Sequence, residues 1–372
     1  DGDGCRKLFG EYNMQQIIIS KDMEGQRLNK FLGKYLDAAP QSFLYKMLRK
    51  KNIKLNSGKA DGSEILSAGD TVTIYMTDET IAKFRKDESM PKTGNGIDGS
   101  HLDANTDKEK KKTKNSLCRN PLKDIEILYE DEDILMLNKP AGVLSQKAQM
   151  NDYSLNEQIV DYYRLKHDNE AFFTPSVCNR LDRNTSGIIL AGMSLKGSRV
   201  LSRMLKDRTV DKYYVTIVCG KVEKASIIKG FLVKKKNHNQ VLVYETLEEA
   251  KGVGTDKPAY IETKYEPIQY GIFQGMEFTF LKVKLVTGKT HQIRAHLCSV
   301  GHPIIGDGKY GNKPINDRLR KEFGLKHQLL HACEMCFPDR ETEPELTENL
   351  EKRVFQADLP KEFVNIKTDI FE

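Results

Sequence analysis

The chain has 372 residues with a formal net charge of +6, long enough for two or three domains and too mildly basic to identify a polyanionic partner by charge alone. No apolar run approaches the roughly 18 residues of a membrane-spanning helix, and the N-terminal stretch DGDGCRKLFG lacks the pattern of a signal peptide. The seven cysteines are scattered and odd in number, which argues against a small disulfide scaffold. Together these features favour a protein of the reducing cytoplasm.

Residues 12–78 have the pattern of a small α+β domain. The stretches RLNKFLGKYL and QSFLYKMLRKKNI place apolar residues at helical spacing, and a short strand, IKLN, and an alternating strand in LSAGDTVTIYM follow. Basic residues lie between the apolar stripes, and because they cluster on two adjacent helices we favour phosphate binding over an ordinary solvated face. These residues are Arg27, Lys30, Lys34, Lys46, Arg49, Lys50 and Lys51.

Residues 79–120 differ sharply in composition from their neighbours. They contain few aliphatic side chains and many Lys, Asp, Gly, Ser and Asn, so they bury too little apolar surface to offset the entropy of ordering. We therefore expect a flexible linker. Its run KEKKKTK could touch phosphates loosely, although a solvated spacer is the simpler interpretation.

Residues 121–372 alternate strands with a few helices. DILMLNKPAG, GIILAGMS, KYYVTIVCG and LKVKLV read as strands, and SLKGSRVLSRMLKDR reads as a helix. Helices do not follow the strands at the regular spacing of a doubly wound parallel sheet. We therefore expect an α+β fold with a mixed, largely antiparallel central sheet flanked by helices.

The stretch THQIRAHLCSVGHP predicts one further helix. Thr290 is its expected N-cap, Ile293, Leu297 and Val300 form its expected buried stripe, and Gly301 ends it.

Asp182 is the first candidate for chemistry. It lies in NRLDRNTSG between Arg180 and Arg183, and adjacent arginines favour a carboxylate over an acid, which suits a nucleophile or a base. The small residues that follow permit a sharp turn and close approach of a ligand. An Asx-turn or a cap for the following residues is the competing interpretation.

Two further residues join Asp182. Tyr213 and Tyr214 point to opposite faces of a strand, so only one of them can face a given cleft, where its ring could stack on a base. Arg294 is offset from the apolar stripe of its helix, and a buried guanidinium needs a carboxylate, for which Asp182 is available.

Metal and cofactor motifs are weak or absent. His291, His296, Cys298 and His302 lack the spacing of a zinc site, and the single CxxC of Cys333 and Cys336 favours apolar packing. There is no Walker loop, GxGxxG after a strand, HExxH or GxSxG. A reaction without cofactor or metal is the simpler expectation.

Together, these segments resemble the RNA pseudouridine synthases, and within them the branch that modifies uridines in large-subunit ribosomal RNA. The family block H-R-L-D-x-x-T-S-G is similar to N-R-L-D-R-N-T-S-G, with Asn179 in place of the histidine, and gives the catalytic role to Asp182. The family's K-x-Y strand selects Tyr214, and its helix block H-Q-I-R-x-H makes Arg294 the expected salt-bridge partner of the aspartate. The resemblance covers about Ile125 to Phe337, and the N-terminal piece is similar to an S4-type RNA-binding domain.

The resemblance implies isomerisation of uridine in RNA, most simply 23S ribosomal RNA. We expect no cofactor, and a monomer is the default expectation. The target base leaves its stack, Arg180 occupies the vacated space, Asp182 attacks C1′ or removes a sugar proton, and Tyr214 stacks on the uracil. Other residues expected at the RNA are Arg183, Lys139, Lys289, His291 and Gln292.

Three alternatives stay open at this point. The substrate could be transfer RNA, or the fold could serve a non-catalytic RNA-binding or ribosome-assembly factor. A glycosidase-like hydrolase would need a second carboxylate beside Asp182, supplied from elsewhere in the fold.

Overall fold

The computed structural model describes residues 14–20, 23–85, 120–167, 173–235, 240–253, 257–346 and 348–372. The chain divides into two compact units. The first comprises residues 1–120 with 161–174 and 194–196, and the second comprises residues 121–160, 175–193 and 197–372. Most of the predicted linker, including its KEKKKTK run, lies outside the described residues, as do Cys5 and Cys118.

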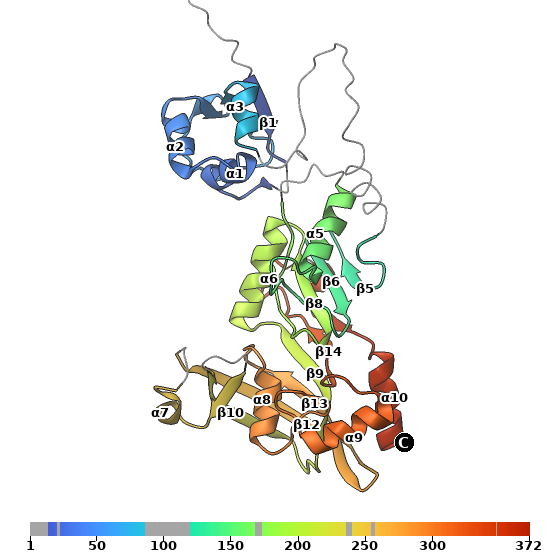
Figure 1. Cartoon of the computed structure of the whole chain (residues 1–372). Coiled ribbons are helices and arrows are strands. Elements are labelled where there is room, and N and C mark those ends of the chain that lie inside the picture. Colours follow the sequence, from blue (N-terminus) through green and yellow to red (C-terminus); the bar gives the residue numbers. More distant parts are fainter. Residues whose placement is uncertain are drawn as a thin grey trace, which may run out of the picture. The chain divides into compact units, whose positions relative to one another are not determined.

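In its described residues 14–20 and 23–85, the first unit contains a four-stranded antiparallel sheet with the helices α1, α2 and α3 (Figure 1). The sheet order is β1 (Met14–Ile18), β4 (Thr71–Tyr75), β2 (Ile53–Leu55) and β3 (Gly58–Lys59), and the helices are α1 (Leu28–Tyr35), α2 (Gln41–Arg49) and α3 (Asp78–Lys83). The predicted apolar stripe of α1 is buried at Leu28, Phe31, Leu32 and Tyr35 because these residues recur every three or four positions. Ile81 of α3 also belongs to this core, so the predicted linker begins too early.

The basic residues predicted on this unit all lie at its surface. The exposed set is Arg27, Lys30, Lys34, Lys46, Arg49, Lys50 and Lys51.

The second unit is built on one large sheet, as the α+β prediction requires. Its strand order is β11–β10–β12–β13–β9–β14–β8–β6–β5, with β15 paired to β14 and β7 to β8. The pair β14–β8 is parallel and the other pairs are antiparallel. The mixed, largely antiparallel sheet is therefore confirmed. The strands are β5 (Glu126–Glu130), β6 (Ile134–Lys139), β7 (Ser176–Val177), β8 (Ser186–Gly192), β9 (Asp211–Cys219), β10 (Ser226–Lys234), β11 (Val241–Tyr244), β12 (Ala259–Phe273), β13 (Met276–Leu285), β14 (Leu330–Cys336) and β15 (Val354–Gln356).

Helices lie between these strands and after β15 (Figure 1). They are α5 (Leu155–Lys166), α6 (Leu195–Asp207), α7 (Leu247–Ala250), α8 (Gln292–Ser299), α9 (Lys313–Phe323) and α10 (Lys361–Phe371), with a short 3-10 turn at Glu348–Leu350. No helix in the described ranges combines the length and apolar character needed to cross a membrane.

The strand register brings distant segments together at the start of β8. Gly187 of β8 pairs with Ala332 of β14, and Ala332 pairs with Tyr214 of β9. A Cβ on Gly187 would lie 2.2 Å from the Ala332 carbonyl oxygen, and its φ is +110°, so only glycine fits there. The loop that precedes β8, with Asp182, is thereby placed near Tyr214.

Helix α8 differs from its prediction at both ends. Its N-cap is His291 and not Thr290, because His291 takes the left-handed conformation with φ 55° immediately before the helix. Val300 is 40% exposed and lies outside the buried stripe, whereas residues 292–297 are all buried. The helix is enclosed almost all round, so a one-sided stripe describes it poorly.

Candidate active site

A cleft of about 980 Å³ opens in the second unit at the point where the loop before β8 faces Tyr214 and the start of α8. The three residues predicted to carry chemistry, Asp182, Tyr214 and Arg294, all line it. They come from a loop, a central strand and a helix, and the strand register described above sets their proximity.

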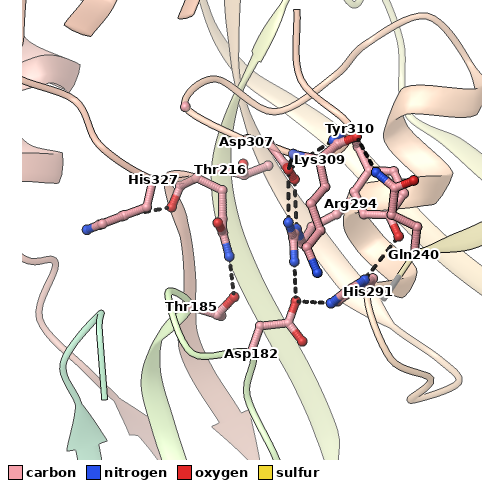
Figure 2. A network of polar contacts seen from close by, with 12 residues as sticks. Asp182, Thr185, Thr216, Gln240, His291, Arg294, Asp307, Lys309, Tyr310 and His327 are labelled. Atoms are coloured by element: carbon pink, nitrogen blue, oxygen red, sulfur yellow. Dashed lines mark hydrogen bonds and ion pairs between the residues drawn. The ribbon is translucent and has the colours of Figure 1, made fainter. Parts of the chain in front are cut away.

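Arg294 connects two carboxylates. Its Nη1 donates to Asp182 Oδ2 at 2.8 Å, while its Nε and Nη2 donate to Asp307 Oδ2 and Oδ1 at 2.7 and 2.9 Å. Figure 2 shows the guanidinium between the two acids. Burial alone would lower the pKa of Arg294, but the hydrogen bonds and charge of Asp307 and then Asp182 raise it overall, so the guanidinium stays charged.

Asp307 is the residue that sequence reasoning missed. Its side chain is fully buried and accepts, besides the two bonds from Arg294, the backbone N–H groups of Lys309 and Tyr310 at Oδ1. Burial would raise the pKa of this carboxyl, but the bonds from Arg294 and the backbone lower it. The available signal was the turn GDGKYG, whose Asp suits an Asx-type turn onto its own backbone.

Asp182 has a more open environment than Asp307. Its side chain is 23% exposed, and its contacts with Arg294 and with His291 both involve Oδ2. Among the residues that the structure describes, no protein donor reaches Oδ1. One oxygen of an ion-paired carboxylate is therefore available to a molecule in the cleft.

The flanking arginines do not supply the counter-charge expected of them. Arg180 and Arg183 are both exposed, and Arg183 Nε donates to the carbonyl of Gly142 at 3.1 Å. In the described part of the chain Arg294, 112 positions away, is the guanidinium paired with Asp182. The side chain of Asp182 turns toward α8, so its direct ion pair is made with a residue distant in sequence and not with its neighbours.

Lys139 does not face RNA as predicted, because its side chain is completely buried. Its Nζ donates to the carbonyls of Pro140, Val143 and Arg183 at 2.8 to 3.1 Å. Burial lowers its pKa to about 7, partly offset by the charge of Asp182. Since three acceptors require three N–H groups, these carbonyls favour the ammonium form. Lys139 thus fastens the turn after β6 to the Asp182 loop.

A second attachment holds the same loop. Ser145 Oγ donates to the Leu181 carbonyl at 2.8 Å and accepts from the Leu181 N–H at 3.1 Å. The Asp182 backbone is therefore held on both sides by residues of the segment after β6.

His291 lies against Asp182 in a strained backbone conformation. Its Nε2 is 4.0 Å from Asp182 Oδ2, and its Nδ1 is 3.0 Å from the hydroxyl of Tyr310 (Figure 2). That hydroxyl already accepts the N–H of Val241, so we assign its proton to His291 Nδ1 and the imidazole proton to Nε2, facing the carboxylate. Burial lowers the pKa of His291, which favours the neutral ring.

Gln292 was also predicted to contact RNA, but its side chain is buried in the protein. It is 2% exposed, its Oε1 accepts from Thr287 and Lys289, and its Nε2 donates to the Glu262 carbonyl and to Thr263. With its amide saturated by protein, Gln292 fixes the start of α8 against β12. Lys289, by contrast, is exposed and lines the cleft.

Tyr214 faces the cleft and Tyr213 faces the opposite side of β9, as strand alternation predicts. Tyr214 is 5% exposed, and burial followed by the charge of Asp182 raises its pKa, so it stays a neutral phenol at pH 7. Tyr213 lies beneath the ammonium groups of Lys282 and Lys284 at 4.6 and 5.5 Å from its ring centre.

The charge of the cleft is strongly one-sided. Among the described residues that line it, nine are Lys or Arg and only Asp182 is acidic. The cations are Lys147, Arg180, Arg183, Arg208, Lys212, Lys289, Arg294, Lys309 and Lys326. Such a surface suits a polyanion. Within the described ranges no group of three or more His, Cys, Asp or Glu side chains is arranged to hold a metal ion.

Comparison with known proteins gives a consistent result. Residues 133–299, which include Asp182, Tyr214 and Arg294, match the family model described as RNA pseudouridylate synthase. The chain is 29% identical over 347 residues to the ribosomal large subunit pseudouridine synthase C of Vibrio cholerae, covering 92% of this chain and 96% of that protein. It is 27% identical over 333 residues to an uncharacterised RNA pseudouridine synthase of Mycoplasma genitalium, covering 88% and 90%.

A solved structure shares the fold. The human RNA pseudouridylate synthase domain containing 4 superposes with a TM-score of 0.50 at 18% identity, covering 65% of this chain and 92% of that one.

Proposed function

Because residues 133–299 match the RNA pseudouridylate synthase family model, we propose that the chain isomerises uridine to pseudouridine in 23S ribosomal RNA with Asp182 as the catalytic carboxylate. The curated relatives reported above include an enzyme named for the large ribosomal subunit, which favours this substrate over transfer RNA. The reaction would take place in the cytoplasm, on a monomeric enzyme without a cofactor.

One observation carries the catalytic assignment. Asp182 is ion-paired through Oδ2 while Oδ1 has no protein donor within the described residues, at the wall of a cleft that also holds Tyr214. Isomerisation breaks the C1′–N1 bond and forms a C1′–C5 bond, so the base gains a proton at N1 and loses one at C5. Attack on C1′ and removal of a sugar proton both require the carboxylate form, and Arg294 Nη1 donates to this carboxylate at Oδ2.

Tyr214 provides a surface for the base. Because its pKa is raised by burial and by Asp182, the ring enters the reaction as a neutral phenol and is no phenolate base at pH 7. Its role is to stack against uracil in the cleft.

We assign to Arg180 the role of filling the space that the extruded base leaves. The target nucleotide must leave its stack, at a cost of a few kcal/mol. Arg180 is exposed at the cleft, and no partner is seen for it in the described part of the protein. A planar guanidinium can stack and donate hydrogen bonds in the vacated space.

RNA binding involves both units in this proposal. The cations of the cleft, such as Arg183 and Lys289, face the substrate. The edge of the cleft near His291 faces it as well. The exposed basic residues of α1 and α2 give the first unit a phosphate-binding surface of the S4 type.

The hydrolase alternative is disfavoured by the same site. Paired-carboxylate hydrolysis needs a second acid in the cleft, but Asp182 is the only acid among its described lining residues. Asp307, the nearest candidate, is saturated by Arg294 and two backbone N–H groups.

The decisive experiment incubates the purified protein with an unmodified transcript of 23S ribosomal RNA and maps pseudouridine by chemical labelling and primer extension. Wild type and Asp124→Asn, which loses an exposed carboxylate elsewhere, should form pseudouridine, and Asp182→Asn should not. If the 23S transcript stayed unmodified while a transfer RNA pool became modified, the substrate would be transfer RNA. Turnover by Asp182→Ala would refute the catalytic assignment. Release of free uracil would support a hydrolase.

A further inference from the structure

Lys212 stands apart from the other lysines around strand β9. Side chains alternate along the strand, so Lys212 and Tyr214 face the cleft while Asp211 and Tyr213 face the other side. On that other side, Lys284 donates to Asp211 at 2.5 Å and Lys282 to Glu334 at 3.2 Å. The lysines opposite the cleft are therefore neutralised by acids.

In the described part of the chain, Lys212 has no such partner. The residue is only 8% exposed, yet no carboxylate or other acceptor among the described residues forms an ion pair or hydrogen bond with its Nζ. The adjacent acid, Asp211, is already occupied by Lys284 on the opposite face. Most of the side chain is removed from water, but its unpartnered Nζ still reaches the cleft, where a ligand can supply the missing charge.

A second cation faces the same place. Arg208 follows the end of α6, lines the cleft beside Lys212 and forms no ion pair among the described residues. Its φ of +63° is the left-handed conformation, which is uncommon for a residue other than glycine. Burial lowers the pKa of Lys212, and the charge of Arg208 lowers it further, against a smaller opposing effect of Asp211. Two unpaired cations that repel each other mark a position prepared for an anion.

We propose that Lys212 and Arg208 form a phosphate-binding subsite for the RNA backbone next to the nucleotide held over Tyr214. Lys212 and Tyr214 are two residues apart on one strand face, about 7 Å along the strand. A base against the ring and its neighbouring phosphate on the ammonium can therefore be bound together. This inference rests on the proposed function and adds to it the group that fixes the register of the substrate.

The first test measures the free protein. Lys212→Met keeps the length of the stem and removes the charge, and Lys206→Met makes the same change on an exposed residue of α6 away from the cleft. At equal ionic strength, inorganic phosphate should raise the melting temperature of wild type and Lys206→Met more than that of Lys212→Met. Without phosphate, Lys212→Met should melt at or above wild type, because a cation that is mostly shielded from water and has no counter-ion has been removed. A lower melting point, or an equal response to phosphate, would overturn the proposal.

The second test measures RNA binding by fluorescence anisotropy with a single-stranded oligonucleotide of twelve uridines. Lys212→Met should bind roughly tenfold more weakly than wild type at low salt, since a hydrogen bond to a charged group is lost. The slope of log affinity against log salt should become shallower by about 0.7, the value for one phosphate contact on a single strand. Arg208→Asn, which tolerates the left-handed backbone, should behave in the same way, and Lys206→Met should match wild type. Equal slopes for Lys212→Met and Lys206→Met would refute the subsite.

These tests are separable from the proposed function. If wild type forms no pseudouridine but its response to phosphate depends on Lys212, the isomerase assignment fails and the anion site remains. If wild type is active and Lys212→Met keeps the wild-type KM for the transcript and the wild-type salt slope, the subsite fails and the isomerase remains.

Discussion

The loops around Asp182 and Asp307 hold two carboxylates on one guanidinium with very different surroundings. Asp307 is fully buried, and four N–H groups, two from Arg294 and two from the backbone, occupy its oxygens. Asp182 is 23% exposed and receives one hydrogen bond from Arg294, at Oδ2 (Figure 2). The residue types are the same, and the surroundings separate their roles.

The difference shows how the site fixes a reactive carboxylate without saturating it. Arg294 uses two of its donors on Asp307, which sets the direction of the remaining Nη1 toward Asp182. A bidentate pair of this kind is directional, so Asp307 positions the guanidinium and the guanidinium positions Asp182. Asp182 keeps one oxygen for the substrate, whereas Asp307 has none to offer.

The largest effect is expected at the open carboxylate. Asp182→Asn should lower pseudouridine formation at least about a thousandfold, because the charge that acts on the sugar is lost. Unfolding should change by about 1 kcal/mol or less, since Arg294 keeps Asp307 as its partner. Single-turnover assays and urea unfolding measure the two quantities. If Asp182→Asn were inactive because it is unfolded, the proposed difference between a catalytic Asp182 and a structural Asp307 would be refuted.

The buried carboxylate should show the opposite balance. Asp307→Asn puts an amide N–H where an acceptor stood against the buried Arg294, so the free energy of unfolding should fall by about 3 kcal/mol or more. Activity should fall as well, through the loss of Arg294 alignment. Urea unfolding of this variant is compared with Asp317→Asn, which removes an exposed ion pair and should change stability by less than about 0.5 kcal/mol. Equal unfolding midpoints for the two variants would contradict the assigned role.

The same helix offers a pH test of its buried environment. His296 on α8 is fully buried, and burial lowers its pKa to about 4, below the ordinary 6.5. The unfolded chain therefore binds more protons between these values, and stability falls as pH drops from 6.5 to 4 by up to about 3 kcal/mol. His296→Gln should reduce this loss of stability. Part of the loss should remain, because the pKa values of His291 and His331 are also lowered. Denaturant unfolding at pH 7, 5.5 and 4.5 checks the slope, and an unchanged slope in the variant would exclude His296.

The smallest effect on stability is expected beside the open carboxylate. Arg180→Gln should leave the free energy of unfolding within about 0.5 kcal/mol of wild type, because the side chain is exposed and does not pair with Asp182. Turnover should fall about tenfold or more if the guanidinium occupies the space of the extruded base. Placing 2-aminopurine next to the target uridine reports extrusion directly. Normal extrusion and turnover in the variant would remove Arg180 from the mechanism.

Local sequence determined the elements and the identity of the reacting groups. Helical spacing in RLNKFLGKYL gave the buried face of α1, and alternation in KYYVTIVCG put Tyr213 and Tyr214 on opposite faces. Motif resemblance selected Asp182, Tyr214 and Arg294, and the ion pair of Asp182 with Arg294 is present in the structure. These features depend on neighbours within a few residues or on a block of fixed spacing.

Tertiary structure alone decided which polar residues are buried and with whom they pair. Lys139 and Gln292 were expected at the RNA, yet both are enclosed by carbonyl and amide partners. Asp307 emerged as the second partner of Arg294, and the neighbours Arg180 and Arg183 did not pair with Asp182. The physical reason is that burial and hydrogen-bond partners come from segments far apart in the chain, brought together by the register of β8, β14 and β9. A short window of sequence contains the donor but not its acceptor.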